Sequence, residues 1–201
     1  MDCELIPQTI FRNLPTLETS RLILRKMTLD DAADMFEYAS DPAVSRYTLW
    51  NPHRTIKDSE EFLKGISSSY EKGLIENWGI ALKENNKFIG TCGYFYWNQE
   101  FARAEIQYAM SGKYWGKGLM TEAVCRVLEF GFTEMKLNRV EARCMLDNIG
   151  SERVMQKNGM KFEGIARQAI FAKEKYFDLK VYAILKSEFN GQACRDSANR
   201  A

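Results

Sequence analysis

The segment Gly112–Ala123, GKYWGKGLMTEA, has residue types and a spacing that suit the binding of an anion. Gly116 and Gly118 flank Lys117, and apolar residues at helical spacing follow directly. A glycine turn that opens a helix leaves backbone N–H groups free, and these donors favour a phosphate together with the helix dipole. Glycine also lets the backbone approach a ligand closely, because it has no side chain. The segment therefore predicts a phosphate-binding turn.

Two common phosphate motifs do not fit this segment. The P-loop pattern G-x-x-x-x-G-K-[ST] requires a glycine five residues after Gly112, where Lys117 stands. The dinucleotide pattern G-x-G-x-x-G fits Gly116 and Gly118, but Thr121 occupies its third glycine position. Enzymes that bind ATP or a nicotinamide cofactor through these loops are therefore disfavoured. A connecting turn without a ligand stays an alternative for a G-x-G pattern taken alone.

The predicted elements around the turn indicate a mixed sheet with helices on its faces. Alternating residues predict a strand at 21–27, and Thr28 followed by Asp31 is a capping pattern for the next helix. The other predicted strands are 78–83, 87–97, 103–110, 139–145, 161–167 and 176–185, and the other predicted helices are 56–73, 119–136 and 151–159. A meander of strands followed by crossovers is typical of an α+β fold with a mixed sheet.

Several ordered segments resemble the GNAT family of acyl-CoA N-acyltransferases, and within it the branch that acetylates the N-terminal alanine or serine of ribosomal proteins. The family's pyrophosphate loop, [RQ]-x-x-G-x-[GA], corresponds to Lys113–Gly118, with lysine at the first position. Its N-x-x-S segment corresponds to Asn148–Ser151, and residues 157–164, KNGMKFEG, resemble its K-x-G-F-x-x-E-G stretch. Residues 19–32 and 40–47 also resemble this branch.

The resemblance implies a domain organisation and a more specific fold. Residues 17–189 would form one GNAT domain, preceded by an N-terminal extension at 1–16. The polar residues 190–201 would form a tail that we expect to be disordered. The central sheet would be mixed but mostly antiparallel, with helices on both faces.

The resemblance also implies a reaction and a donor. An acetyl group would pass directly from acetyl-CoA to a primary amine, either a protein N-terminal amine or a small amine, without a covalent enzyme intermediate. The strand before the turn would splay from the next strand and leave backbone groups free. The Met110 N–H would bond to the thioester carbonyl, and Asn148 would contact the pantetheine arm or lie near the sulfur. The pyrophosphate would be held by the backbone N–H groups of Trp115, Gly116, Lys117, Gly118 and Leu119, with added positive charge from the side chains of Lys113 and Lys117.

Two residues are expected to move protons. An amine is mostly protonated at neutral pH, so a base is needed, and Glu105 on the strand leading to the turn is the candidate. A surface ion pair of Glu105 with Arg103 or Arg143, and a water chain as the base, stay alternatives. Ser151 is the expected acid for the departing thiolate, although its position also suits a helix N-cap, and an acid is not strictly required.

Aromatic residues are the candidates for contact with the acceptor. Trp50 lies in a loop bounded by prolines, and Tyr47 and Trp78 are further bulky residues that suit a cleft for an amine. These three belong to a larger set of aromatic residues, and core packing is the alternative for about half of that set. The set is Tyr47, Trp50, Trp78, Tyr94, Tyr96 and Trp97.

The composition argues against several other classes of partner. The formal net charge is +1, and no basic surplus points to nucleic acid or to a membrane surface. No apolar run approaches the roughly 20 residues that span a membrane, and the N-terminus lacks a signal-peptide pattern, so we expect a cytoplasmic protein. A single histidine and the lack of C-x-x-C spacing predict no metal site. A non-catalytic acyl-CoA-binding module stays the alternative function, and a homodimer stays open.

Overall fold

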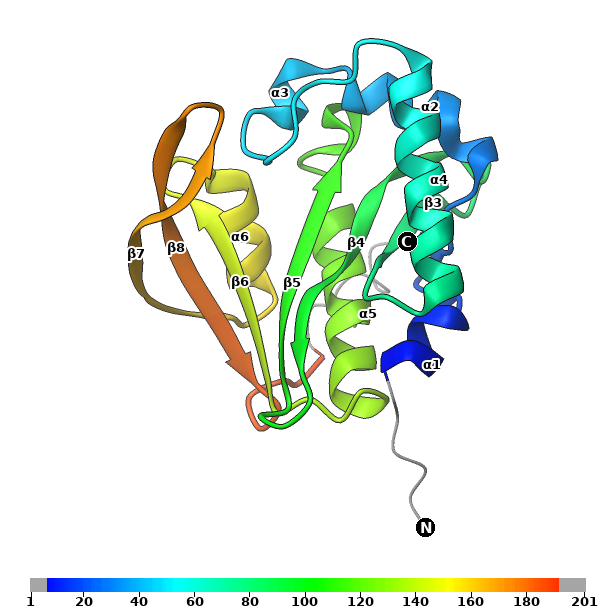
Figure 1. Ribbon diagram of the computed structural model, residues 1–201. Helices are drawn as coiled ribbons and strands as arrows, with labels where there is room; N and C mark the ends of the chain where they lie inside the picture. Colours follow the sequence, from blue (N-terminus) through cyan, green and yellow to red (C-terminus); the bar gives the residue numbers. More distant parts are fainter. Residues whose placement is uncertain (1–6, 192–201) are drawn as a thin grey trace.

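The computed structural model describes residues 7–191 and contains one eight-stranded sheet (Figure 1). The strand order is β1-β2-β3-β4-β5-β6-β8-β7. The strands are β1 (Leu17–Glu18), β2 (Leu22–Arg25), β3 (Asn77–Leu82), β4 (Phe88–Asn98), β5 (Arg103–Met110), β6 (Arg139–Met145), β7 (Lys161–Ala172) and β8 (Lys175–Leu185). Every neighbouring pair is antiparallel except β5 and β6, which are parallel. The predicted α+β fold with a mixed, mostly antiparallel sheet is confirmed.

Helices cover both faces of this sheet (Figure 1). The helices are α1 (Pro7–Arg12), α2 (Ala32–Ala39), α3 (Pro42–Ser45), α4 (Ile56–Lys72), α5 (Leu119–Thr133) and α6 (Ile149–Lys157). Helices α2 and α4 pack together on one face, and α5 and α6 pack together on the other. Residues 111–118, which contain a short 3-10 helix at Gly112–Tyr114, connect β5 to α5 and place the N-terminus of α5 near the end of that strand.

Local signals in the sequence account for several element boundaries. Thr28 and Asp31 form the predicted capping box ahead of α2. Helix α4 ends at Gly73, which takes the left-handed conformation with φ 68°. Asn86, in the turn between β3 and β4, has φ 55°, a conformation that asparagine tolerates. These boundaries match the predicted ones because each depends on a short-range interaction.

The N-terminal residues of the described chain pack differently from the expectation. Residues 7–16 were expected to belong to an extension, but Ile10, Phe11 and Leu14 are buried in the domain core. This stretch therefore packs as part of the domain. Most of the predicted polar tail, from residue 192 onward, lies outside the described residues. None of the helices within 7–191 combines the length and apolarity that crossing a membrane requires.

Candidate active site

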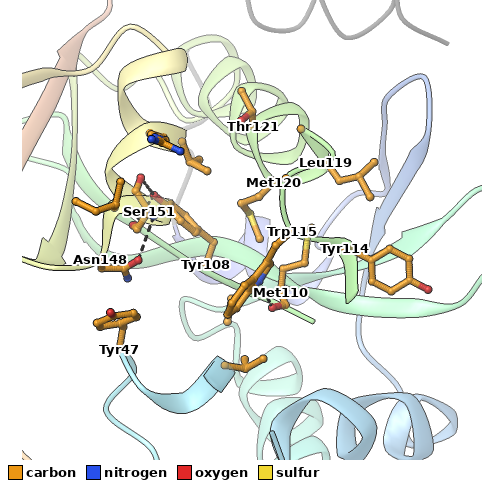
Figure 2. Close-up of a pocket in the computed structure, with 18 of the residues that line it drawn as sticks. Tyr47, Tyr108, Met110, Tyr114, Trp115, Leu119, Met120, Thr121, Asn148 and Ser151 are labelled. Carbon is orange, nitrogen blue, oxygen red and sulfur yellow. Dashed lines mark hydrogen bonds between the residues drawn. The ribbon is translucent and has the colours of Figure 1, made fainter. Parts of the chain in front are cut away.

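A cavity of about 550 Å³ opens where β5 ends and α5 begins (Figure 2). Its walls come from α3 and the residues after it, the last three residues of β5, the glycine turn, the first turn of α5 and the exposed side of α6. The predicted site residues that line it are Tyr47, Met110, Trp115, Gly116, Gly118, Leu119, Asn148 and Ser151. Segments more than 100 residues apart in the sequence therefore meet around one space.

The cavity lies where β5 and β6 diverge. These strands pair only at their beginnings, from Arg103 opposite Arg139 to Glu105 opposite Glu141. Beyond Glu105 the ladder stops, and the two strands separate towards the cavity (Figure 1). The splay expected from the family resemblance is therefore present. It leaves one edge of β5 without a neighbouring strand along the half nearest the glycine turn.

The backbone of Met110 faces this gap. The Ser111 N–H donates to the Ile89 carbonyl on β4 at 2.9 Å. N–H directions alternate along an antiparallel strand, so the N–H of Met110 points to the opposite edge, toward β6. The Met110 carbonyl points the same way and accepts a 2.8 Å hydrogen bond from the indole Nε1 of Trp115. A donor directed into the cavity is what the stabilisation of a carbonyl oxygen requires.

The glycine turn has the backbone geometry of an anion site. Gly116 and Gly118 have φ 75° and φ 77°, in the left-handed region that favours glycine. Gly118 is the N-cap of α5 and supplies no side-chain cap, so the helix begins with uncapped N–H groups. A Cβ built on Gly116 would meet no atom within 4 Å, which means that open space faces this residue. These features fit a pyrophosphate held by backbone donors.

The two lysines of the turn do not contribute their charges to the cavity. The ammonium of Lys113 forms an ion pair with Glu37 on α2, and neither Lys113 nor Lys117 lines the cavity. The Lys117 ammonium lies over the ring of Tyr114, 5.1 Å from its centroid. The predicted contribution of these side chains to coenzyme A binding is therefore not supported, and the backbone donors remain.

A hydrogen-bonded group of three residues forms the opposite wall (Figure 2). The Ser151 N–H donates to Oδ1 of Asn148, so Asn148, and not Ser151, is the N-cap of α6. The Ser151 hydroxyl is thereby free of capping, and its Oγ lies 2.9 Å from the hydroxyl of Tyr108 on β5. That hydroxyl is also 3.1 Å from the Ser151 carbonyl oxygen. Burial raises the pKa of Tyr108 well above its ordinary value, so the phenol keeps its proton at neutral pH.

The sequence interpretation missed Tyr108 and two cations on α6. Tyr108 stands two residues before Met110, and this period-2 spacing places both on one face of β5. Arg153 and Lys157 also line the cavity, and they are four residues apart on one side of α6. Within residues 7–191 neither cation has an acidic partner. The i,i+4 spacing of these cations was visible in the sequence.

The predicted base does not reach the cavity. Glu105 is odd-numbered on β5, and its side chain lies on the face opposite to Tyr108 and Met110. Five residues separate it from Met110, roughly 16 Å along a strand. Its carboxylate pairs with Arg143 at 3.5 Å, and burial raises its pKa although Arg143 opposes that shift. The structure therefore favours the ion-pair alternative for Glu105.

One carboxylate does line the cavity, and that is Asp147. Its side chain is 66% exposed, and Oδ2 lies 3.7 Å from the guanidinium of Arg46 and 3.5 Å from the hydroxyl of Tyr47. The group stands at the cavity rim, where the segment after α3 approaches the start of α6. No group of three or more His, Cys, Asp or Glu side chains within 7–191 is placed to hold a metal ion.

Of the three predicted acceptor contacts, one lies at the cavity. Tyr47 lines the space next to Asn148 (Figure 2), with its hydroxyl 3.5 Å from Oδ2 of Asp147. Trp50 is half-buried against the core and packs beside His53, with ring centroids 5.8 Å apart. Trp78 is fully buried, stacks edge-on against Phe130 and donates its indole N–H to the Pro15 carbonyl. Trp78 therefore has no surface with which to contact an acceptor, and its predicted role is not supported.

The comparison with known proteins agrees with the geometry of the site. Residues 21–161 match the family described as "Acetyltransferase (GNAT) domain". The chain is 35% identical over 178 residues to the "Uncharacterized N-acetyltransferase p20" of Bacillus licheniformis, which covers 89% of this chain and 100% of that protein.

Solved structures give the same result. A GNAT-family acetyltransferase from Bacillus anthracis has a TM-score of 0.77 and 32% identity, over 87% of this chain and 100% of that one. The ribosomal L7/L12 α-N-protein acetyltransferase RimL, solved with coenzyme A, has a TM-score of 0.75 at 18% identity, over 85% of this chain and 98% of that one. The last likeness shows the fold alone. With the splayed strands, the glycine turn and these relatives taken together, the chain belongs to the GNAT family of acetyltransferases, which transfer an acetyl group from acetyl-CoA to an amine.

Proposed function

We propose that this enzyme acetylates a primary amine, at a protein N-terminus or on a small molecule, in a ternary complex. The observation that carries the proposal is one continuous cavity, which joins the uncapped N-terminus of α5, the gap between β5 and β6, and Tyr47. A donor anchored at the helix and an acceptor entering past Tyr47 would meet beside Met110. The RimL likeness makes a protein N-terminus a reasonable first acceptor to test.

Different residues around the gap would bind the donor, polarise its carbonyl and supply a proton to the leaving thiolate. Acetyl-CoA supplies the activated acyl group when it is bound. The N–H groups that open α5 bind the pyrophosphate, and the Met110 N–H orients and polarises the acyl carbonyl. Asn148 uses Oδ1 for the helix cap, which leaves its Nδ2 group to donate to the pantetheine arm. The hydroxyl pair of Tyr108 and Ser151 holds a proton close to the expected position of the leaving sulfur.

The acceptor side carries the complementary charge. A primary amine arrives mostly as an ammonium, and Asp147 at the rim attracts it. The turn between β7 and β8 is held against the end of α3, because the Lys173 ammonium donates to the Ser45 carbonyl at 2.5 Å. Tyr47 and Asp147 thus form the proposed entrance, and the amine loses its proton there to solvent.

The experiment that tests this function is an acetyl-CoA turnover assay that detects free thiol. The panel contains peptides that begin with Ala, Ser, Met or Thr, then polyamines and aminoglycosides. We expect thiol release with at least one amine, together with a mass increase of one acetyl group on that amine. Binding of acetyl-CoA without acetylation of any amine would favour the non-catalytic module instead.

Two carboxylate variants, run beside the parent, separate the candidate roles. Glu105→Gln is expected to keep kcat within roughly threefold, since Glu105 serves an ion pair outside the cavity. Asp147→Asn is expected to raise the KM for the acceptor about threefold to fivefold, the loss of one exposed charge interaction. A collapse of kcat in Glu105→Gln alone would restore Glu105 as the base.

The cations on α6 give a second test of the donor site. We propose that Arg153 and Lys157 bind the 3′-phosphate of coenzyme A. The double variant Arg153→Ala/Lys157→Ala should raise the KM for acetyl-CoA by about tenfold, in line with two partly screened charge pairs. Acetyl-3′-dephospho-CoA should show almost no such change. Lys64→Ala on α4 is the control, because it removes an exposed lysine from the opposite face. Equal losses with both donors would assign the cations to the pyrophosphate.

A further inference from the structure

A buried carboxylate at the start of α5 accepts several hydrogen bonds from residues 19–21, about 100 positions earlier in the sequence. Glu122 is 1% exposed and lies in the first turn of α5. Its Oε1 accepts from the hydroxyls of Thr19 and Ser20 and from the N–H of Arg21, and its Oε2 accepts from the guanidinium of Arg21 at 2.7–2.8 Å. Burial opposes ionisation, but these donors outweigh it and lower the pKa of Glu122, so the group is charged at neutral pH.

The same arginine reaches the glycine turn. Nη1 of Arg21 donates to the carbonyl oxygen of Lys117 at 3.1 Å. In a planar trans peptide the C=O and the following N–H point in opposite directions. Arg21 therefore fixes the N–H of Gly118 pointing away from itself. Because Gly118 lines the cavity and Arg21 does not, we infer that this N–H points toward the cavity, where the pyrophosphate is proposed to bind.

Arg21 also balances charge at the helix end. The N-terminus of α5 favours an anion, but the ionised Glu122 in the first turn works against a second negative group nearby. The guanidinium, which contacts Oε2 of the carboxylate through both Nε and Nη2, offsets that charge. Removal of Arg21 would leave a buried carboxylate without its counter-charge, beside the proposed phosphate site.

We propose that Arg21 is a positioning residue for the coenzyme A pyrophosphate, which acts through Lys117 and Glu122 without touching the ligand. The proposal rests on the proposed function, since it takes coenzyme A as the ligand of the turn. Arg21 sets the peptide between Lys117 and Gly118 before the ligand arrives, so its loss weakens donor binding more than it affects the chemical step.

The chain offers a closely matched control. Arg25, four residues further along on β2, pairs with Asp31 through Nη1 and Nη2 at 2.9 and 2.7 Å. The Asp31 carboxylate is also buried. The exposed fractions of the side chains are 21% for Arg25 and 5% for Asp31, similar to 29% for Arg21 and 1% for Glu122. Neither Arg25 nor Asp31 lines the cavity. Arg25→Gln therefore reproduces the loss of an arginine–carboxylate pair away from the turn.

The test measures the Kd of coenzyme A by calorimetry, and the Tm, for the parent, Arg21→Gln, Arg21→Lys and Arg25→Gln. We expect Arg21→Gln to weaken coenzyme A binding about tenfold, and Arg21→Lys about threefold, because lysine keeps the charge but cannot bridge both partners. Arg25→Gln should lower the Tm by a similar amount and leave the Kd unchanged. In turnover assays Arg21→Gln should raise the KM for acetyl-CoA while kcat changes less than twofold.

The other possible results would overturn either the positioning role of Arg21, the proposed function, or both. Equal shifts of Kd in Arg21→Gln and Arg25→Gln, or a lower Tm in Arg21→Gln at unchanged Kd, would overturn the positioning role and leave the proposed function intact. A parent that binds coenzyme A but acetylates no amine would overturn the proposed function alone. A parent that binds no coenzyme A would overturn both.

Discussion

A Gly116→Ala enzyme is expected to bind acetyl-CoA about tenfold to a hundredfold more weakly, equivalent to ~1.4–2.7 kcal/mol. Gly116 has φ 75°, and an L-residue held there is strained by roughly 1–2 kcal/mol. The new methyl group would meet no protein atom, so it would project into the open space where a phosphate approaches the backbone. The strain and the obstruction act on the same few backbone donors. The KM for acetyl-CoA and the Kd of coenzyme A are the quantities to measure.

Gly65→Ala supplies the control for this substitution. Gly65 lies within α4 and also has open space around a built Cβ, but its backbone is helical. Alanine there should raise stability by up to about 1 kcal/mol and leave the KM unchanged. Unaltered donor affinity in Gly116→Ala, with a Tm loss of the expected size, would mean that the turn does not hold the pyrophosphate.

The second large effect is expected from Tyr108→Phe, which should lower kcat about tenfold to a hundredfold, at the lower end of general acid catalysis. The Tyr108 hydroxyl contacts both the Oγ and the carbonyl of Ser151, and Phe keeps the ring without this proton. Because burial raises the pKa of Tyr108, the parent should retain the proton donor well above neutral pH. We therefore expect no alkaline fall in kcat from this group up to about pH 9.

Two further variants make this test specific. Ser151→Ala and the double variant with Tyr108→Phe should each lose about as much as Tyr108→Phe alone, since hydroxyls that act as one unit are non-additive. Tyr94→Phe on β4 removes a comparable buried hydroxyl, bonded to the Val127 carbonyl at 2.8 Å, and should leave kcat unchanged. Full activity in Tyr108→Phe would show that the thiolate leaves without help from this pair.

Short-range signals in the sequence predicted most of the frame. The capping residues Thr28 and Asp31, the left-handed Gly73 and the two glycines of the turn each act within a few residues, and all are found as expected. The sheet type followed from the order of the strands, and the splay of β5 from β6 followed from the family resemblance.

Side-chain partners across the fold could not be predicted in the same way. Lys113 pairs with Glu37, 76 residues away, and so turns from the ligand it was expected to bind. Trp78 is typical of a cleft residue by type alone, but its strand lies in the middle of the sheet under α5. Helix α6 begins two residues earlier than predicted because Asn148, and not Ser151, caps it. Each of these outcomes depends on contacts that only the assembled domain defines.

The short parallel contact between β5 and β6 has a consequence for how the domain holds together. Backbone continuity across the sheet at this point depends on three residue pairs, whereas β4 and β5 share eight. We therefore expect the strands β1–β5 and the strands β6–β8 to open as two units, beginning where the pairing of β5 with β6 ends. A ligand that occupies the gap contacts both units, so it couples their opening equilibria. We therefore expect a bound acyl donor to stabilise the sheet against opening along this line.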